Sequence, residues 1–297
     1  MAMTNAASTT EVVRVDRRTM QRFLPLLDQW LLPGQFYGVQ HTWPQLYRSD
    51  GDGMFFVSLE GERLLSHCAC RIETVIGANG PQRVTLIGSV ATDPTRRGEG
   101  LASAVLAAAV AACEQRSDAM LLWAERPELY TKHGFVDGRE ERCLVLARRP
   151  RSADFEKVRL AEVRDHAALH ALHEHNPLRV VRSLNVMSGL LTTPGMTTVV
   201  LEEGGEVIAY ACCGKGSDLQ GHWHEMSGSD EAVARLLPAA MHVAEQLDAM
   251  VLVPPYRSTL RDLLGTSVVE EGVLAGPMVR AHDATNASFW IDGLDSV

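Results

Sequence analysis

The segment from Val84 to Cys113 constrains the fold more than any other part of the chain. An apolar run, Val84–Val90, leads into Ala91-Thr-Asp-Pro-Thr-Arg-Arg-Gly-Glu-Gly100, and an unbroken Ala/Leu/Val segment then extends from Leu101 to Cys113. This order predicts a strand, a glycine-bearing loop and the first turn of a helix. Backbone N–H groups at a helix start are free to bind anions, and the helix dipole adds positive potential. Because Arg96 and Arg97 add charge to the loop, the segment predicts a site for a phosphate-bearing ligand.

The glycine spacing separates the known phosphate-binding motifs. Gly98-Glu-Gly100-Leu-Ala-Ser103 departs from the dinucleotide fingerprint Gly-x-Gly-x-x-Gly at its last position, and a P-loop sequence does not occur. The run from Arg97 to Ala102, Arg-Gly-Glu-Gly-Leu-Ala, resembles motif A of the GNAT N-acetyltransferase superfamily, Arg/Gln-x-x-Gly-x-Gly/Ala. Further on, Glu128-Leu-Tyr-Thr-Lys-His-Gly-Phe135 resembles the Leu/Phe-Tyr-x-x-x-Gly-Phe signature of the same family. The alternative is a glycine turn before a core helix, but two motifs in the family's order favour the resemblance.

The resemblance implies a cofactor and the residues that hold it. In this family the loop amides bind the pyrophosphate of acetyl-CoA, and the preceding strand pairs with the pantetheine arm. The implied pyrophosphate residues are Arg97, Gly98, Glu99, Gly100, Leu101 and Ala102, and the implied pantetheine residues are Val90, Ala91 and Thr92. Glycine at two loop positions fits this role because a side chain there would obstruct close approach of a ligand. The resemblance thus implies acetyl-CoA as co-substrate and no metal.

The resemblance also implies a general acid, and the position of a glutamate after a predicted strand suggests a general base. Tyr130 matches the position of the family's general acid for the CoA thiolate, and the alternative is that it packs on the cofactor. Glu125 follows the predicted strand Ala119–Trp123, which would border the acceptor cleft, so it could take the amine proton directly or through water. Alternatively, Glu125 is the N-terminal cap of the helix that begins near Pro127. His67 is a further candidate base, although a lone histidine on a strand is more often structural.

Other polar clusters have simpler interpretations. His222 and His224 are placed on one face of a predicted strand, where a polar sheet face is favoured over a metal pair. The histidines at positions 166, 170 and 173 have helical spacing and predict a solvated helix face. The six cysteines form no Cys-x-x-Cys pair, so we expect buried, reduced thiols in a cytoplasmic protein.

Length and composition limit the classes of protein. A chain of 297 residues with 46% hydrophobic and 22% charged residues fits a globular protein of two domains. Its net charge of −9 argues against a nucleic-acid binder and mildly favours a cationic substrate. The apolar runs are too short to cross a membrane, and the first ten residues lack the features of an export signal and predict a flexible tail.

The order of predicted elements indicates an α/β fold with mixed sheets. A helix is expected over 12–32, strands over 54–59, 63–75 and 83–90, and a last strand near the C-terminus. The charged, proline-containing stretch 147–157 suggests a boundary between domains 1–150 and 151–297. Residues 59–68 resemble 203–212, and residues 114–122 resemble 245–252, but the second copy lacks the glycine loop. We therefore expect two GNAT-like domains in tandem, the second degenerate, with two unrelated α/β halves as the alternative.

These features together predict an N-acetyltransferase. The expected reaction moves an acetyl group from acetyl-CoA to a primary amine of a small molecule or peptide by direct transfer in a ternary complex. The second domain would complete the substrate cleft or form a homodimer surface. A longer acyl-CoA as donor and a non-catalytic CoA-binding sensor are the alternatives. The acceptor is not identifiable, because acceptor pockets in this family are built from its most variable segments.

Overall fold

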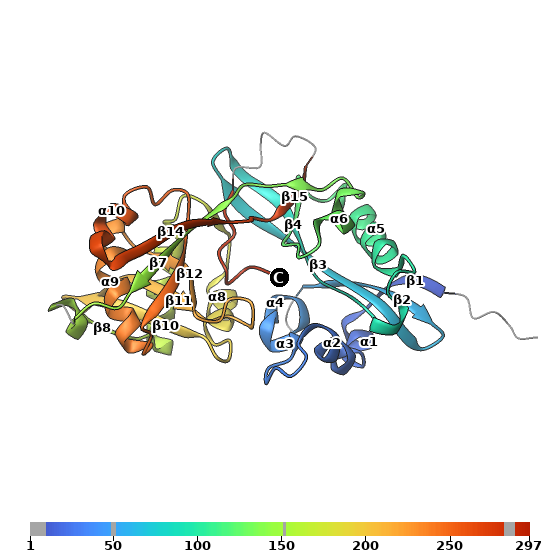
Figure 1. Cartoon of the computed structure of the whole chain (residues 1–297), viewed down its shortest axis with the longest axis horizontal. Coiled ribbons are helices and arrows are strands. Elements are labelled where there is room, and N and C mark those ends of the chain that lie inside the picture. The colour runs from blue at the N-terminus through green and yellow to red at the C-terminus, as the bar shows by residue number, and fades with distance from the viewer. Residues whose placement is uncertain (1–9, 49–51, 151–152, 282–288) are drawn as a thin grey trace, which may run out of the picture.

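The computed structural model describes residues 10–48, 52–150, 153–281 and 289–297. The flexible tail expected at the N-terminus lies outside these residues except for Thr10, which begins the first strand. Two mixed sheets, one in each half of the molecule, form the frame of the structure (Figure 1). The prediction of a mixed α/β fold is therefore confirmed.

The first sheet is built mainly from the N-terminal half. Its order begins β1 (Thr10–Val15), β2 (Met54–Glu60), β3 (Arg63–Gly77), β4 (Gly80–Thr92) and β5 (Ala119–Leu122). It ends with β15 (Met278–Ala281) and β6 (Val136–Asp137), and β9 (Arg179–Val180) pairs with β3. Helix α5 (Leu101–Cys113) packs in one core cluster with β2 to β5. The short helices α1 (Arg17–Gln21), α2 (Leu24–Leu31), α3 (Val39–Thr42) and α4 (Pro44–Tyr47) form a separate cluster with β1 to β4.

The second sheet is built mainly from the C-terminal half. Its order is β8 (Val158–Leu160), β10 (Thr197–Glu203), β11 (Glu206–Cys213), β12 (His222–Ser227), β13 (Asp248–Val253), β7 (Glu141–Ala147) and β14 (Val268–Leu274). Helix α9 (Asp230–Val243) shares the largest core cluster with these strands. Helices α7 (His166–Glu174) and α8 (Leu184–Leu191) pack in another cluster with β10 and β11. Helices α6 (Pro127–Thr131) and α10 (Leu260–Leu264) follow β5 and β13.

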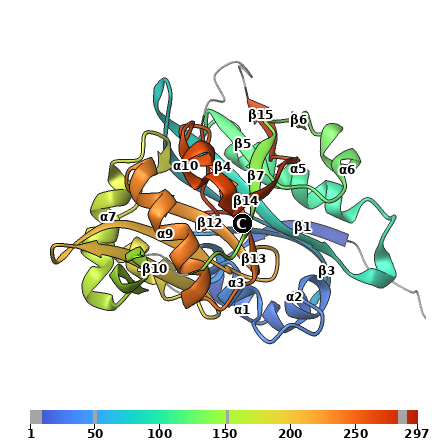
Figure 2. The ribbon, with the colours of Figure 1, turned by 60° about the vertical axis from the view of Figure 1, so that its left-hand side comes forward.

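The two sheets repeat one strand order and exchange strands with each other. The pairings β1-β2-β3-β4 and β8-β10-β11-β12 are all antiparallel, and β4-β5 and β12-β13 are both parallel. Next to β5 lies β15 from the C-terminal half, and next to β13 lies β7 from the N-terminal half. Figure 1 shows β7 among the strands of the C-terminal half and β15 among those of the N-terminal half, and Figure 2 shows β15 beside β6.

Most predicted elements are present, with two corrections. The helix at 101–113 and the strands near 54–59, 63–75 and 83–90 are confirmed. The segment 12–32 is not one helix, because its β-branched start pairs as β1 with β2 and helices begin only at Arg17. The expected last strand is also wrong: residues 289–297 form an irregular segment with a turn, in which Leu294 is fully buried.

Two further observations concern the cysteine thiols and the helices. All six cysteines are free and buried, as expected. Among the described residues, no helix combines the length and the apolar character needed to cross a bilayer.

Candidate active site

The first sheet opens where β4 and β5 diverge. The two strands pair in parallel only over Val84–Leu86 and Ala119–Leu121. Beyond that point β4 carries an extra residue relative to β3, since His67 pairs with Ala91 whereas Ala69 pairs with Gly88. A bulge of this kind bends a strand away from its neighbour. The backbone of Val90, Ala91 and Thr92 therefore continues past the parallel pairing with β5, and a linear ligand could pair with it there.

The loop after β4 ends in an uncapped helix start. Gly98 and Gly100 have φ angles of 89° and 80°, and a Cβ at either would meet no atom within 4 Å. Glycine is thus required by the left-handed backbone rather than by lack of space. Helix α5 begins at Leu101 with Gly100 as its N-cap and no side-chain hydrogen bond to its first turn. The N–H groups of Leu101 and Ala102 lie in that turn, so this end of the helix can bind an anion.

The two arginines of the loop differ in their partners. Arg96 donates to Glu99 at 2.7 Å and lies 3.4 Å from Glu60, so its charge is largely balanced by two carboxylates. Arg97 is exposed and makes no ion pair within the part of the chain that the structure describes. The expectation that both arginines add free positive charge is therefore corrected: only Arg97 does so. Glu99 faces Arg96 with its side chain, which leaves its backbone as the part available to a phosphate.

Tyr130 and Glu125 both follow β5 in the chain, and the Glu125 charge acts on Tyr130. Tyr130 belongs to α6 and packs edge-on against Phe135, with ring centroids 6.3 Å apart. Burial, together with the charges of Cys68 and Glu125, raises the pKa of Tyr130 to about 12. Glu125 is exposed and does not cap α6, whose N-cap is Arg126 without a side-chain hydrogen bond. The capping interpretation of Glu125 is therefore wrong.

The bulge of β4 contains a buried polar cluster, of which the sequence indicated only His67. Ser89 has a φ of 50°, and its hydroxyl accepts a hydrogen bond from the Tyr47 hydroxyl at 2.7 Å. Its carbonyl lies 2.9 Å from Nδ1 of His67, which must therefore carry the proton and donate. Burial lowers the pKa of His67 to about 4, and its Nε2 has no partner. No pattern in the sequence links Tyr47 to Ser89, because only the folded sheet brings them together.

Glu141 is a second residue that the sequence analysis missed. It begins β7, pairs with Leu274 of β14, and its carboxylate accepts a hydrogen bond from Trp123 at the end of β5. Burial raises the pKa of Glu141 to about 7. A carboxyl group with this pKa is suited to exchange protons near neutral pH. Its position depends on the strand exchange, so sequence alone could not relate it to β5.

The remaining histidines serve the packing of the second half. His170 and His173 lie 2.7 and 2.8 Å from the carbonyls of Arg182 and Val180, and His173 is fully buried. The solvated face expected from positions 166, 170 and 173 is therefore wrong. His224 is likewise buried, in a bulge of β12. Within the described residues, no group of three or more His, Cys, Asp or Glu could hold a metal.

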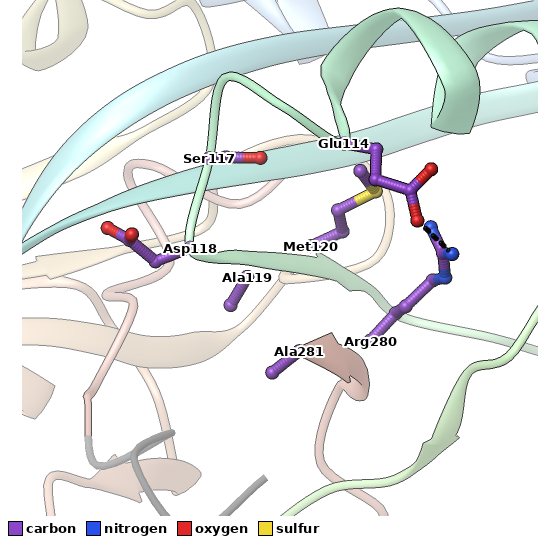
Figure 3. Close-up of a pocket in the computed structure, with 7 residues that line it drawn as sticks. All are labelled: Glu114, Ser117, Asp118, Ala119, Met120, Arg280 and Ala281. Atoms are coloured by element: carbon purple, nitrogen blue, oxygen red, sulfur yellow. Dashed lines mark hydrogen bonds and ion pairs between the residues drawn. The ribbon is translucent and has the colours of Figure 1, made fainter. Parts of the chain in front are cut away.

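A small cavity of about 50 Å³ lies at the start of β5, at the opposite end of the strand from Glu125 and Tyr130 (Figure 3). It is lined by Glu114, Ser117, Asp118, Ala119, Met120, Arg280 and Ala281, and Glu114 forms an ion pair with Arg280 at 2.5 Å. Because β4 and β5 are still paired at this end, the cavity is separate from the opening after Leu86 and Leu121.

The second sheet has a corresponding opening with different ends. Strands β12 and β13 pair only at His222 and Trp223, and β12 then bulges at His224. Only Gly228 and Ser229 separate β12 from α9, where residues 93–100 separate β4 from α5. The Ser229 side chain caps α9 by accepting from Ala232 N–H, and Asp230 and Glu231 lie in its first turn. This helix start is therefore closed to a phosphate.

Comparisons with known proteins agree with this geometry. Residues 24–135 match the acetyltransferase (GNAT) family. No curated protein matches the chain. Among solved structures, a conserved protein of unknown function from Enterococcus faecalis V583, described as a probable N-acyltransferase, is similar with a TM-score of 0.71 and 16% identity, over 92% of this chain and 73% of that one.

Two further solved structures show the same fold. A GCN5-related N-acetyltransferase from Kribbella flavida has a TM-score of 0.65 and 17% identity, over 96% of this chain and 75% of its own. Eis1 from Mycobacterium abscessus has a TM-score of 0.62 and 13% identity, over 92% of this chain and 74% of its own. The chain thus contains a GNAT acetyltransferase family domain, and the structural similarity to these longer proteins covers more than nine tenths of this chain.

Proposed function

We propose that the protein is an N-acetyltransferase that moves an acetyl group from acetyl-CoA to a primary amine of a small molecule or peptide. Transfer would be direct, within a ternary complex of enzyme, acetyl-CoA and amine. The main support is the divergence of β4 from β5, followed by an uncapped glycine turn at the start of α5. These features lie within residues 24–135, which match the acetyltransferase family.

The proposed cofactor site follows the free backbone from β4 to α5. The backbone of Val90, Ala91 and Thr92 would pair with the pantetheine arm, and an N–H there would face the thioester oxygen. Such a donor stabilises the charge that develops on the carbonyl during attack. The pyrophosphate would be held by the backbone of Arg97, Gly98, Glu99, Gly100, Leu101 and Ala102, with the free Arg97 guanidinium adding positive charge.

Tyr130 is the proposed general acid. A phenol with a pKa of about 12 is protonated at neutral pH, so it can donate to the departing CoA thiolate. Its half-buried position on α6, just after β5, supports this role.

Glu125 is the proposed general base, taking the amine proton directly or through water. Its exposed position between β5 and α6 supports contact with an acceptor, and its charge acts on Tyr130. Glu141 competes for the role because of its pKa of about 7. Glu125→Gln and Glu141→Gln, compared in the pH dependence of CoA release, separate the two: loss of the rising acidic limb identifies the base.

The second half is proposed to be a degenerate copy of the same domain. The repeated strand order and the closed start of α9 support this proposal. We assign the two domains to residues 1–150 and 151–297, with β7 of the first joining the second sheet and β9 and β15 of the second joining the first sheet. The second domain would complete the substrate cleft or form a homodimer surface. Six reduced thiols are compatible with a cytoplasmic protein.

Calorimetric titration with acetyl-CoA tests the proposal, with CoA and longer acyl-CoAs as competitors for the same site. We expect one micromolar site per chain and CoA release when primary amines are added. Tighter binding of a longer acyl-CoA would identify a different donor. Binding without acetyl-CoA hydrolysis or transfer would indicate a sensor, and absence of binding would contradict the proposal altogether.

A further inference from the structure

The edge of β12 that faces the opening in the second sheet is already bonded by the chain itself. The carbonyls of His224, Met226 and Gly228 are on alternate residues, which point to one side of a strand. His224 O accepts from Gly293 N–H at 3.0 Å. Met226 O and Gly228 O accept from the Arg257 guanidinium at 3.0 and 3.1 Å. In the first sheet, the corresponding stretch of β4 is the proposed binding site of the pantetheine arm.

The segment that bonds to β12 extends across the opening. Trp290 packs with Leu252 of β13 and Cys143 of β7, whereas Gly293 meets His224 of β12. A Cβ at Gly293 would lie 2.6 Å from the His224 side chain, so only glycine allows this close approach. The segment therefore contacts both diverging strands.

Buried charges hold this segment in place. Arg182 donates two hydrogen bonds to Glu225 of β12, at 2.8 and 2.7 Å, and its Nε donates to Asp295 at 3.0 Å. The buried ammonium of Lys215 donates to the carbonyl of Gly293 at 2.8 Å. Arg182, Glu225 and Asp295 are all at least 97% buried. Because a buried charge is costly without its partner, these pairs are a strong constraint on where the segment lies.

We propose that the opening between β12 and β13 binds the chain's own C-terminal segment, residues 290–295, in place of a cofactor. This inference rests on the proposed function, in which the second domain is a degenerate copy. Arg257 occupies the end of this opening nearest α9, and residues 290–295 occupy the rest. The second domain is thus a receptor for a peptide segment rather than a second CoA site.

The C-terminal segment also contacts the first domain. After Asp295 the segment crosses to the first sheet, where Val297 lies against Gly88 of β4. The Gln45 side chain, from α4, donates to the carbonyl of Leu294 on the way. The segment bound in the opening of the second domain therefore also contacts β4 of the first domain, next to the bulge at Ser89.

Hydrogen–deuterium exchange of the full chain, followed by mass spectrometry of the C-terminal peptide, tests the proposal. Gly293→Ala pushes a methyl group against His224, and Asp295→Asn weakens the bond to Arg182 while keeping its shape. Both variants should lower the protection of residues 290–297 by roughly tenfold or more, while α9 and β2 to β4 keep theirs. The matched control is Gly272→Ala on β14, where a Cβ makes only an ordinary 3.4 Å contact.

Two results would overturn the proposal. One is a wild-type segment that exchanges as fast as an unstructured peptide, or one whose protection Gly293→Ala and Asp295→Asn leave unchanged. The other is a calorimetric stoichiometry of two acetyl-CoA molecules per wild-type chain. If no acetyl-CoA binds, the proposed function fails, whereas the exchange data still decide whether the segment fills the opening.

Discussion

Ser89 has a strained backbone conformation at the candidate site. It has one of two positive φ angles found among the described non-glycine residues, the other being at Glu245. Such a conformation costs about 1–3 kcal/mol and persists only where its surroundings hold it. Tyr47 and His67 supply that support by hydrogen bonds to the Ser89 hydroxyl and carbonyl. The bulge that opens β4 from β5 is therefore fixed by side chains from α4 and β3.

His67 should make the stability of the protein depend on pH. Its pKa is about 4 in the folded protein, against 6.5 unfolded, because burial disfavours the charged ring. The neutral ring is favourable above pH 6.5, and this contribution is lost as the pH falls from 6.5 towards 4. We expect His67→Asn, which keeps a donor but cannot titrate here, to remove about 2 kcal/mol of the stability change between pH 7 and pH 5.

The measurement for His67 is urea unfolding of wild type and variant at both pH values. His242→Asn is the control, since this histidine is only partly buried and lies beside the Arg149 carbonyl and the Phe155 ring. Equal pH dependence of wild type and His67→Asn would show that the buried ring does not remain neutral.

Tyr130→Phe should lower turnover and leave acetyl-CoA affinity nearly unchanged. Removing the hydroxyl removes the proton donor for the thiolate but keeps the packing against Phe135. General acids contribute roughly 10²-fold or more to rate. CoA release and calorimetry are the two measurements, and Tyr256→Phe in the second domain is the control. Wild-type turnover in Tyr130→Phe would limit Tyr130 to packing on the cofactor.

At the scale of elements, the start of α5 and the start of α9 differ in one feature that decides anion binding. The first follows a loop with two left-handed glycines and has no side-chain cap, whereas Ser229 caps the second. Each helix packs in a core cluster with the strands of its own sheet. The different starts of the two helices therefore distinguish the two halves in anion binding.

Gly100→Val should abolish acetyl-CoA binding. Valine is disfavoured at a φ of 80°, so the turn must change and move the N–H groups of α5. We expect a loss of about 1–2 kcal/mol in stability as well. Gly204→Val provides the matched control, because Gly204 also has a positive φ, 62°, with no atom near its Cβ. Calorimetry should show lost binding in the first variant only; equal affinity in both would contradict the loop assignment.

At the scale of the molecule, the exchanged strands connect the two halves. Strand β7 completes the second sheet, and β15 completes the first. Leu144 of β7 is fully buried in the core of the second half, although the chain around it connects to β6 of the first sheet. Neither half can therefore lose its borrowed strand without exposing part of its own core.

Leu144→Ala should destabilise both halves together. Truncating a fully buried leucine costs about 2–5 kcal/mol. Hydrogen exchange should show loss of protection in β2 to β4 as well as in β10 to β12, with one unfolding transition. Leu263→Ala on the exposed side of α10 is the control. Loss of protection confined to β10 to β12 would show that the halves unfold separately.

The sequence by itself determined the local parts of this protein. Apolar periodicity, glycine spacing and the two motifs predicted β4, the loop, α5 and Tyr130, because these depend on neighbours in the chain. The repeated hairpins likewise indicated two sheets. The strand at 10–15 was missed because a short β-branched run is stabilised by its partner, β2, and not by its own sequence.

Only the tertiary structure decided which distant segments meet. The exchange of β7 and β15, the contact of Trp123 with Glu141, and the buried Arg182–Glu225–Asp295 cluster each join residues far apart in the chain. The sequence shows that a buried charge or an edge strand needs a partner, but it does not show which residue or strand is that partner. The partner is chosen by the packing of the whole molecule, and here that packing also placed the C-terminal segment between the two sheets.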